Sequence, residues 1–164
     1  MSMYTESYLK NRNTLNKNNI RLQVIGDRKM LPDFAQKELE EALELTASNT
    51  GLTLVMALSY SSRWELVNAV KNIGLDVEKG LIRAEDINAD TLQHYLATSN
   101  LPDPELMIRT SGEYRISNFL LYQLAYAELY FTNTRWPDFR KENLYEAIID
   151  FQSRERRFGK TGHQ

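Results

Sequence analysis

Two arginines and a serine in the second half of this 164-residue chain have the types and spacing of an anion-binding site. Arg109 and Arg115 flank a turn-forming segment, residues 110–113, and Ser117 follows them. Arginine presents a rigid fork of N–H donors that matches phosphate oxygens in pairs, and it stays charged at any working pH. A turn of small residues adds backbone N–H donors for the same anion. We therefore predict an anion site at residues 109–117.

The spacing leaves an alternative open for these arginines. Acids stand nearby in the sequence and could pair with them: Asp103, Glu105 and Glu113. Ser117 supports the anion site through a short helix predicted at residues 117–123. As its cap, Ser117 would place its hydroxyl and the amino end of that helix toward the anion. The residue pattern does not decide between ion pairing and ligand binding.

Glu128 is the one acid in the otherwise apolar and aromatic segment of residues 124–131. A carboxylate is costly in such surroundings unless it is paired or binds a metal ion. One interpretation is a Mg²⁺ ligand or a clamp on the arginines. The other is a buried ion pair with Arg109 or Arg115.

Two further groups of cations have a functional and a structural interpretation. Arg63 follows the segment Ser-Tyr-Ser-Ser, where a strand is predicted to lead into a helix. It would be either a second anion contact or an exposed arginine at a helix entry. The run at residues 154–160, RERRFGK, suits the carboxyl end of a helix. It would alternatively reach a phosphate in its own chain or in a partner.

Hydrophobic periodicity places these groups on alternating strands and helices. Strands are predicted at residues 20–27, 52–60, 106–109 and 127–132. Helices are predicted at residues 33–47, 63–73, 90–98, 117–123 and 142–156, with Asp33 and Asp90 as caps. The nearly all-apolar strand at residues 52–60 has the pattern of a central parallel strand covered on both faces.

This order predicts an α/β domain with a mainly parallel sheet and flanking helices. Ligands of such sheets bind beyond the carboxyl ends of the strands. Polar groups follow three predicted strands, at residues 26–27, 59–63 and 109–117. We expect them to converge at one edge of the sheet.

Composition excludes several classes of function. The net charge of −2 and the pI near 5.8 argue against general nucleic-acid binding, which usually requires a basic domain. The chain has no cysteine, which excludes disulfides and thiolate chemistry and favours the cytoplasm. No apolar stretch is long enough to span a membrane, although a lipid substrate and a peripheral membrane association stay open.

Four segments of the second half resemble the signature of the cis-prenyltransferases, whose bacterial members are undecaprenyl diphosphate synthases. They are PDPELMIRTSGE at residues 102–113, RISNFLL at 115–121, AYAELYF at 125–131 and WPDF at 136–139. The resemblance extends over residues 19–159. It implies condensation of isopentenyl diphosphate onto an allylic diphosphate, farnesyl diphosphate, to make the undecaprenyl diphosphate that serves as a cell-wall lipid carrier.

The resemblance also implies roles for individual residues. Isopentenyl diphosphate would be bound by Arg109, Arg115 and Ser117, with Arg63 as a further substrate contact. Glu128 would lie beside Mg²⁺, the expected cofactor. The last three matching residues resemble the segment that reaches the neighbouring active site in a homodimer: Arg157, Phe158 and Gly159.

The chain departs from the family pattern at two places. These residues contain no Asp-Gly-Asn-Gly-Arg-Trp segment, which supplies the family's catalytic aspartate and allylic diphosphate site. Serines at positions 61 and 62 replace two usual glycines. We therefore expect a polar segment at residues 1–19, a single α/β domain at 20–159 lacking the N-terminal part of the fold, and a tail at 160–164. We expect the chain alone to be inactive, retaining only the isopentenyl diphosphate half-site. The alternative is a truncated fragment or a non-catalytic diphosphate-binding and dimerisation module.

Overall fold

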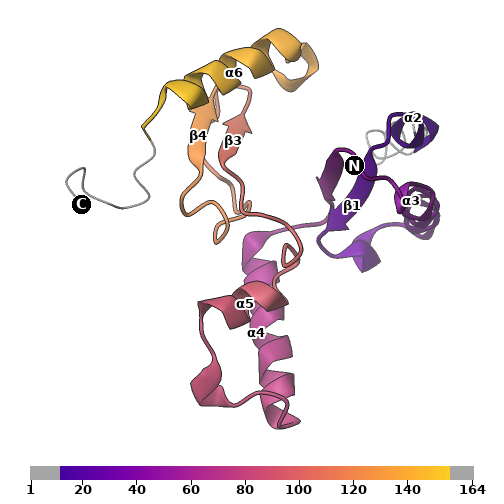
Figure 1. Cartoon of the computed structure of the whole chain (residues 1–164), viewed down its shortest axis with the longest axis vertical. Helices are drawn as coiled ribbons and strands as arrows, with labels where there is room; N and C mark the ends of the chain where they lie inside the picture. Colours follow the sequence, from indigo (N-terminus) through magenta and orange to yellow (C-terminus); the bar gives the residue numbers. More distant parts are fainter. Residues whose placement is uncertain (1–11, 156–164) are drawn as a thin grey trace. The chain divides into compact units, whose positions relative to one another are not determined.

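A computed structural model describes residues 12–155 of the chain. It divides into two compact units, one formed by residues up to Asn100 and the other beginning at Leu101 (Figure 1). The predicted roles of Arg157, Phe158 and Gly159 lie outside the described residues. The predicted single domain at residues 20–159 stays a prediction, and the two units are described separately below.

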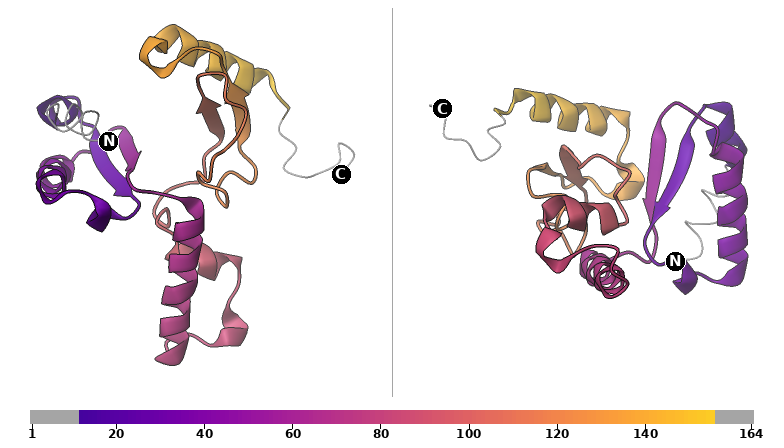
Figure 2. Two further views of the ribbon diagram at one scale, coloured as in Figure 1. Left: turned by 180° about the vertical axis from the view of Figure 1, so that it is seen from behind. Right: turned by 60° about the horizontal axis from the view of Figure 1, so that its bottom comes forward.

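The first unit is built on a pair of parallel strands. Strand β1 (Arg21–Ile25) pairs with β2 (Thr53–Ala57), in a register that places Arg21 opposite Thr53. Helix α3 (Asp33–Thr46) lies alongside this pair, and the short helix α2 (Arg12–Lys17) also contacts β1 (Figure 2). Apolar side chains from β1, α3 and the turn between them form the core: Leu22, Leu31, Ala35, Leu39 and Ala42.

The carboxyl ends of β1 and β2 lie at the same edge of this sheet, as predicted. The backbone N–H of Leu58 donates to the carbonyl of Ile25 at 2.9 Å, and that of Asp27 donates to Ser59 at 3.3 Å. Gly26 between them has a φ of +111°, and a Cβ there would lie 2.1 Å from the Leu58 carbonyl oxygen. Only glycine permits this approach of the two strand ends.

The prediction that β2 is covered on both faces is wrong for the described residues. The strand is half-buried at its centre and exposed at both ends, and Leu52 just before it is 67% exposed. The apolar run indicates a buried strand, but coverage depends on what packs against it. Within the described part of this unit, β1 is the only strand that pairs with β2.

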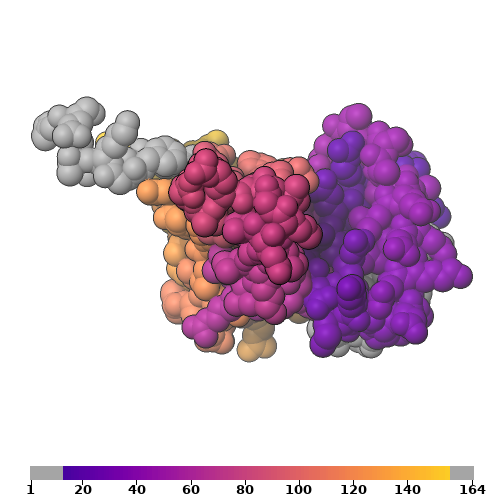
Figure 3. Space-filling model, turned by 90° about the horizontal axis from the view of Figure 1, so that it is seen from below, coloured from indigo at the N-terminus to yellow at the C-terminus, as the bar shows by residue number. Residues whose placement is uncertain are grey.

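Two packed helices complete the first unit. Helix α4 (Ser62–Glu78) begins at the cap Ser61, whose hydroxyl accepts from the Trp64 backbone N–H at 3.3 Å. After the short 3-10 helix η2 (Ala84–Asp86), helix α5 (Ala89–Tyr95) packs on α4, with residues 80–100 drawn in rose in Figure 3. The 3-10 helix η1 (Arg28–Met30) follows β1.

Helix boundaries and caps differ from the predictions at several positions. Helix α5 ends at Tyr95 and the last helix at Ser153, before the predicted ends at residues 98 and 156. Helix α4 runs to Glu78, beyond the predicted end at residue 73. The cap of α5 is Asn88, whose side chain accepts from Thr91, and not Asp90. The cap position of α3 is Pro32. In both of the latter cases the expected aspartate lies in the first helical turn, where a negative charge is favoured by the helix dipole.

The second unit also contains a pair of parallel strands. Strand β3 (Leu106–Arg109) pairs with β4 (Glu128–Phe131), so that Leu106 lies opposite Glu128. The 3-10 helix η3 (Trp136–Asp138) leads to helix α6 (Lys141–Ser153), which contacts β4. Parallel strands with flanking helices in both units confirm the predicted α/β fold class.

The short helix predicted at residues 117–123 is absent, and this prediction is wrong. Residues 117–126 form turns and bends, and three of them have positive φ: Ser117 at 54°, Asn118 at 62° and Leu120 at 46°. These left-handed conformations interrupt a right-handed helix. The apolar residues Phe119–Leu121 therefore lie in a folded loop, and Ser117 caps no helix.

Candidate functional site

Arg109 and Ser117 are brought together at the carboxyl end of β3. The Nη1 of Arg109 donates to the Ser117 hydroxyl at 3.1 Å and also to the backbone carbonyl of Arg115. The loop after β3 thus folds back over its first residue. Both acceptors are uncharged oxygens, and they lie at a strand end of the kind where ligands of parallel sheets bind.

Arg115 follows the alternative interpretation and pairs with an acid. Its Nη1 forms an ion pair with Glu113, and the Arg115 side chain is 64% exposed. A surface ion pair of this kind contributes little stability because water screens both charges. Arg115 lies in the same loop as Arg109, so the two predicted arginines are neighbours with different partners.

The backbone donors predicted for the anion are already used. The N–H of Ser111 donates to the Thr134 carbonyl and the N–H of Gly112 to the Thr132 carbonyl, both at 2.9 Å. Ser111 and Gly112 have φ values of +70° and +66°, as a tight turn requires. This turn therefore fixes the loop to the segment after β4, and the prediction that it offers free N–H groups is wrong.

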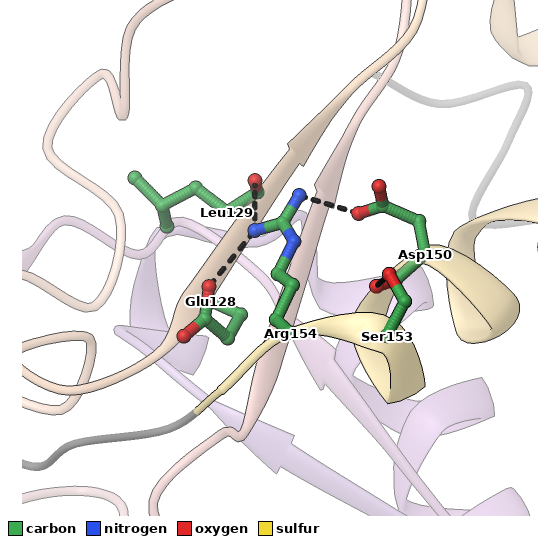
Figure 4. Close-up of polar contacts among 5 residues, drawn as sticks. All are labelled: Glu128, Leu129, Asp150, Ser153 and Arg154. Carbon is green, nitrogen blue, oxygen red and sulfur yellow. Dashed lines mark hydrogen bonds and ion pairs between the residues drawn. The ribbon is translucent and has the colours of Figure 1, made fainter.

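Glu128, the first residue of β4, pairs with neither predicted arginine. Its Oε2 accepts from Nη1 of Arg154 at 2.8 Å (Figure 4). The same nitrogen donates to the Leu129 carbonyl at 3.1 Å, and Nη2 forms an ion pair with Oδ2 of Asp150 at 2.5 Å. We call Glu128, Asp150 and Arg154 the β4–α6 triad. One of the two interpretations of Glu128 was a buried pair with Arg109 or Arg115, but its partner is Arg154, which directly follows α6.

The triad is partly open to solvent, and its two carboxylates both interact with the Arg154 guanidinium. The side chains of Glu128 and Arg154 are 28% and 30% exposed. The Glu128 carboxylate, more than any other group, raises the pKa of Arg154; burial acts in the opposite direction, and Asp150 adds to the rise. Arg154 had been grouped with the cations of a helix end, and its position after α6 agrees with that grouping. Nothing in the sequence around Arg154 predicted its contact with β4.

The described residues do not by themselves fit a resident Mg²⁺ ion. Mg²⁺ prefers several oxygen ligands in near-octahedral geometry. No group of three or more His, Asp or Glu side chains suited to a metal occurs among residues 12–155. The nearest approach is the β4–α6 triad, where the guanidinium of Arg154 lies on the Glu128 carboxylate.

Arg63 lies in the first turn of α4, in the other compact unit, and its side chain is exposed. This placement agrees with a helix-entry arginine at the carboxyl end of β2. Its convergence with Arg109 remains a prediction, because Arg63 and Arg109 belong to different units.

A buried acid near Arg63 was missed by the sequence analysis. Glu65 is 2% exposed; its Oε2 accepts from the Tyr60 hydroxyl at 2.5 Å and its Oε1 from the Ala97 N–H at 3.0 Å. It thereby ties the β2–α4 loop to the segment after α5. The signal was available, since Glu65 shares helical spacing with the buried residues Ala69 and Ile73.

A pocket of about 460 Å³ also opens in the first unit, at the carboxyl end of β1. Its lining combines the β1–α3 loop, one side of α3 and the first turns of α4. The lining residues are Gly26, Asp27, Arg28, Lys29, Gln36, Leu39, Glu40, Trp64 and Asn68. Two acids and two bases balance one another there, so the pocket favours neither a cationic nor an anionic ligand.

Parallel strands flanked by helices in both units define an α/β protein. Residues 1–159 match the family model described as "Putative undecaprenyl diphosphate synthase". The chain belongs to this family of prenyltransferases. The match begins at the first residue, whereas the motif-based resemblance begins at residue 19.

Relatives and a solved structure agree with this family. The chain is 55% identical over 147 residues to an isoprenyl transferase of Chlorobaculum tepidum, covering 90% of this chain and 56% of that one. It is 51% identical over 150 residues to a ditrans,polycis-undecaprenyl-diphosphate synthase ((2E,6E)-farnesyl-diphosphate specific) of Vibrio vulnificus, covering 92% and 60%.

The crystal structure of lavandulyl diphosphate synthase from Lavandula x intermedia in complex with dimethylallyl diphosphate superposes with a TM-score of 0.87. The identity is 31%, and the match covers 98% of this chain and 73% of that one. The chain thus spans less than two thirds of the length of the two bacterial relatives above. Among the described residues, no helix has the length and apolar character needed to cross a membrane.

Proposed function

We propose that this chain supplies the isopentenyl diphosphate half-site of a cis-prenyltransferase that makes undecaprenyl diphosphate from farnesyl diphosphate. The observation that carries the proposal is the contact of Arg109 with the Ser117 hydroxyl at 3.1 Å, at the carboxyl end of a parallel strand. Arg109 is charged and has only uncharged acceptors there. A diphosphate would replace these uncharged acceptors with negatively charged oxygens, which strengthens each N–H···O bond.

The two other loop residues would complete the clamp. Ser117 would turn its O–H toward a phosphate oxygen while Arg109 holds the neighbouring one. Arg115 would leave Glu113 for the diphosphate, because the ion pair is exposed and little is lost when it opens. Arg63 would add a contact from the β2–α4 loop.

The chemistry assigned to the complete enzyme needs little from the protein beyond positioning. The alkene of isopentenyl diphosphate forms a carbon–carbon bond to the allylic substrate, whose diphosphate leaves, and a proton is lost from the isopentenyl carbon chain. A clamped diphosphate places the uncharged alkene beside its partner, which accounts for a large share of such rate enhancements. Mg²⁺ would supply charge neutralisation at the diphosphates.

The remaining expectations extend the same proposal. Glu128 would act on the magnesium side of the site. Arg157, Phe158 and Gly159 would contact the neighbouring active site of a homodimer. The enzyme would work in the cytoplasm, next to the membrane that receives its lipid product.

We further propose that these 164 residues are inactive on their own and retain only the half-site. Support comes from the lack of an Asp-Gly-Asn-Gly-Arg segment among them. The same observation favours the second candidate function, a non-catalytic diphosphate-binding and dimerisation module or a truncated inactive fragment.

Titration calorimetry on the 164-residue chain tests the half-site. We expect isopentenyl diphosphate to bind more tightly than isopentenyl monophosphate, because the second phosphate meets Arg115. Equal affinity for the two ligands, or no binding, would contradict the clamp. A parallel assay supplies farnesyl diphosphate, labelled isopentenyl diphosphate and Mg²⁺. Robust formation of long-chain product would overturn the proposed inactivity while leaving the binding proposal intact.

A further inference from the structure

The pocket at the carboxyl end of β1 contains charged and aromatic groups that the proposed function does not use. Its volume of about 460 Å³ lies within the range of roughly 300–1,000 Å³ that is usual for small-molecule sites. Leu39, which is 1% exposed, and the half-buried Trp64 give the lining an apolar part. All lining residues belong to the first compact unit, so the pocket is distinct from the loop that carries Arg109.

The pocket brings opposite charges to one cavity without pairing them. Arg28 and Lys29 line it from the 3-10 helix η1, and Glu40 lines it from the middle of α3. Within residues 12–155, none of these three side chains forms a hydrogen bond or an ion pair. Charged groups gain most from a partner of opposite charge that also hydrogen-bonds. A ligand that carries both a positive and a negative charge would therefore satisfy the two sides of this pocket together.

The other polar groups of the lining agree with such a ligand. The Asp27 carboxylate already accepts from the Lys29 backbone N–H at 3.1 Å, which fixes the turn of η1. The Nε2 of Gln36 donates to the Leu31 carbonyl at 2.7 Å, which leaves the amide oxygen for a ligand. Gln36 and Glu40 stand one turn apart on α3, so their acceptor oxygens form a side of the pocket that suits an ammonium group.

Trp64 narrows the chemistry of the positive end. The face of a tryptophan attracts ammonium groups, and quaternary ammonium ligands are commonly recognised in this way. Arg28 offers the fork of N–H donors that matches phosphate oxygens. The lining as a whole has two acids and two bases, so a ligand with one charge of each sign leaves it balanced. An amino-alcohol phosphate, in which a short carbon chain joins an ammonium group to a phosphate, has these features.

The segment that supplies the two cations also exposes two large apolar side chains. Met30, the last residue of η1, is 72% exposed, and Phe34, in the first turn of α3, is 54% exposed. Entry of such side chains into a lipid layer is favourable. Residues 27–34 contain two acids and two bases, so they lack the excess of cations that attracts a segment to an anionic membrane. The charge balance favours a zwitterionic lipid surface.

We propose that this pocket binds the head group of a zwitterionic phospholipid. The phosphate would lie on the two cations of η1, and the ammonium group would lie between Glu40 and Trp64. Met30 and Phe34 would enter the lipid layer beside the head group. The site would hold the chain at a membrane, and it does not depend on the diphosphate half-site in the other unit.

Tryptophan fluorescence tests the head-group site in solution. The chain has two tryptophans, so Trp136→Phe leaves Trp64 as the only emitter. We expect phosphocholine to change this emission, and Arg28→Gln to weaken the binding about tenfold through loss of a charged hydrogen bond. Lys71→Gln is the matched control, since it removes a positive charge from an exposed position of α4 outside the pocket. An unchanged emission, or equal affinity in Arg28→Gln, would overturn the site.

A second pair of variants tests the ammonium end. Glu40→Gln should weaken binding of phosphocholine about threefold, because it removes a partly hydrated ionic contact. The same variant should not weaken binding of inorganic phosphate, which has no ammonium group. Glu44→Gln, one turn further along α3 and outside the pocket, should leave both affinities unchanged. Equal losses for phosphocholine and inorganic phosphate in Glu40→Gln would overturn the proposed orientation of the head group.

Vesicle flotation tests the membrane as the source of the head group. The 164-residue chain should float with phosphatidylcholine vesicles, and Met30→Ser or Phe34→Ser should each weaken this binding about tenfold. Leu81→Ser, at a position that is 68% exposed and outside the pocket, is the control and should bind like the unaltered chain. Circular dichroism confirms that each variant is folded.

Two outcomes of the vesicle experiment would contradict the proposal. Tighter binding to phosphatidylglycerol than to phosphatidylcholine vesicles would overturn the preference for a zwitterionic surface. Binding of phosphocholine in solution without binding to phosphatidylcholine vesicles would assign the pocket to a soluble amino-alcohol phosphate and overturn the membrane role. Neither outcome bears on the affinity of the Arg109 loop for isopentenyl diphosphate, which is measured separately.

Discussion

The arginines of the loop after β3 and of the β4–α6 triad differ in their partners. In the loop, Arg109 faces the Ser117 hydroxyl and a backbone carbonyl, and its charge meets no acid among residues 12–155. In the triad, Arg154 lies between two carboxylates. Both regions belong to one compact unit and begin at the ends of paired strands.

An arginine near a candidate site can therefore have uncharged partners that a ligand could replace, or carboxylate partners that stabilise the fold. A ligand that reaches Arg109 displaces only uncharged acceptors. A ligand that reaches Glu128 must first compete with a guanidinium. The first region is therefore expected to govern affinity for the diphosphate, and the second to govern stability.

The largest expected effect comes from removing the uncompensated charge. Arg109→Gln should weaken binding of isopentenyl diphosphate about 10- to 100-fold, because charged hydrogen bonds contribute about 1.5–3 kcal/mol. Its free energy of unfolding should stay close to that of the unaltered chain. Calorimetric titration measures the first and urea unfolding the second. Arg140→Gln, which alters another exposed arginine of this unit, serves as the control. A loss of stability with unchanged affinity would reverse the proposed roles of the two regions.

The second prediction is a gain in affinity for the diphosphate, and it concerns the neighbouring Arg115. Glu113→Gln should tighten binding of the diphosphate about two- to fivefold, because it frees Arg115 from an exposed ion pair worth roughly 0.2–1 kcal/mol. Arg115→Gln should cancel this gain in the double variant. Weaker binding in Glu113→Gln would mean that the acid supports the site and does not mask it.

The third prediction concerns the stability of the triad. Glu128→Gln should lower the free energy of unfolding by about 0.5–1 kcal/mol, a value reduced for the partial exposure of both groups. A double-mutant cycle with Arg154→Gln in urea unfolding isolates the pair from the other contacts of Arg154. A coupling energy near zero would show that the triad does not dock α6.

The smallest effect is expected at a hydrogen bond outside both regions, between Tyr95 and Asp76. The Tyr95 hydroxyl donates to Asp76 at 2.6 Å and is the main cause of the lowered pKa of Asp76, with Lys79 adding to it. A lowered folded-state pKa gives stability that is present above the ordinary value of 3.8 and is lost as pH falls through the folded value. Asp76→Asn should remove this slight acid dependence from thermal unfolding curves. An unchanged acid dependence would assign it to other carboxylates.

Much of the secondary structure followed from local pattern. Residues 106–109 were predicted as a strand and form β3 with the same bounds. The parallel α/β class followed from the alternation of elements and agrees with both units. Where prediction failed, at residues 117–123, apolar spacing suggested a helix, but three positive φ values along the loop exclude one.

The packing around a strand and the partners of buried groups were harder to predict from the sequence. The apolar run of β2 indicates a strand but not what lies against it, and Leu52 is exposed. Glu65 carries a helical spacing that marks it as buried, yet its partner Ala97 comes from a segment far along the chain. Burial follows from local periodicity, whereas the partner of a buried group depends on how elements pack.

The sequence by itself determined the family and the strands that carry Arg109 and Glu128, and it predicted an anion-binding set of residues. Only the tertiary structure decided which of these charges are matched. Arg109 meets Ser117 because the loop turns back through left-handed residues. Glu128 meets Arg154 because α6 packs against β4. Local spacing sets the direction of a strand or helix, but a long charged side chain finds its partner through contacts between elements distant in the chain.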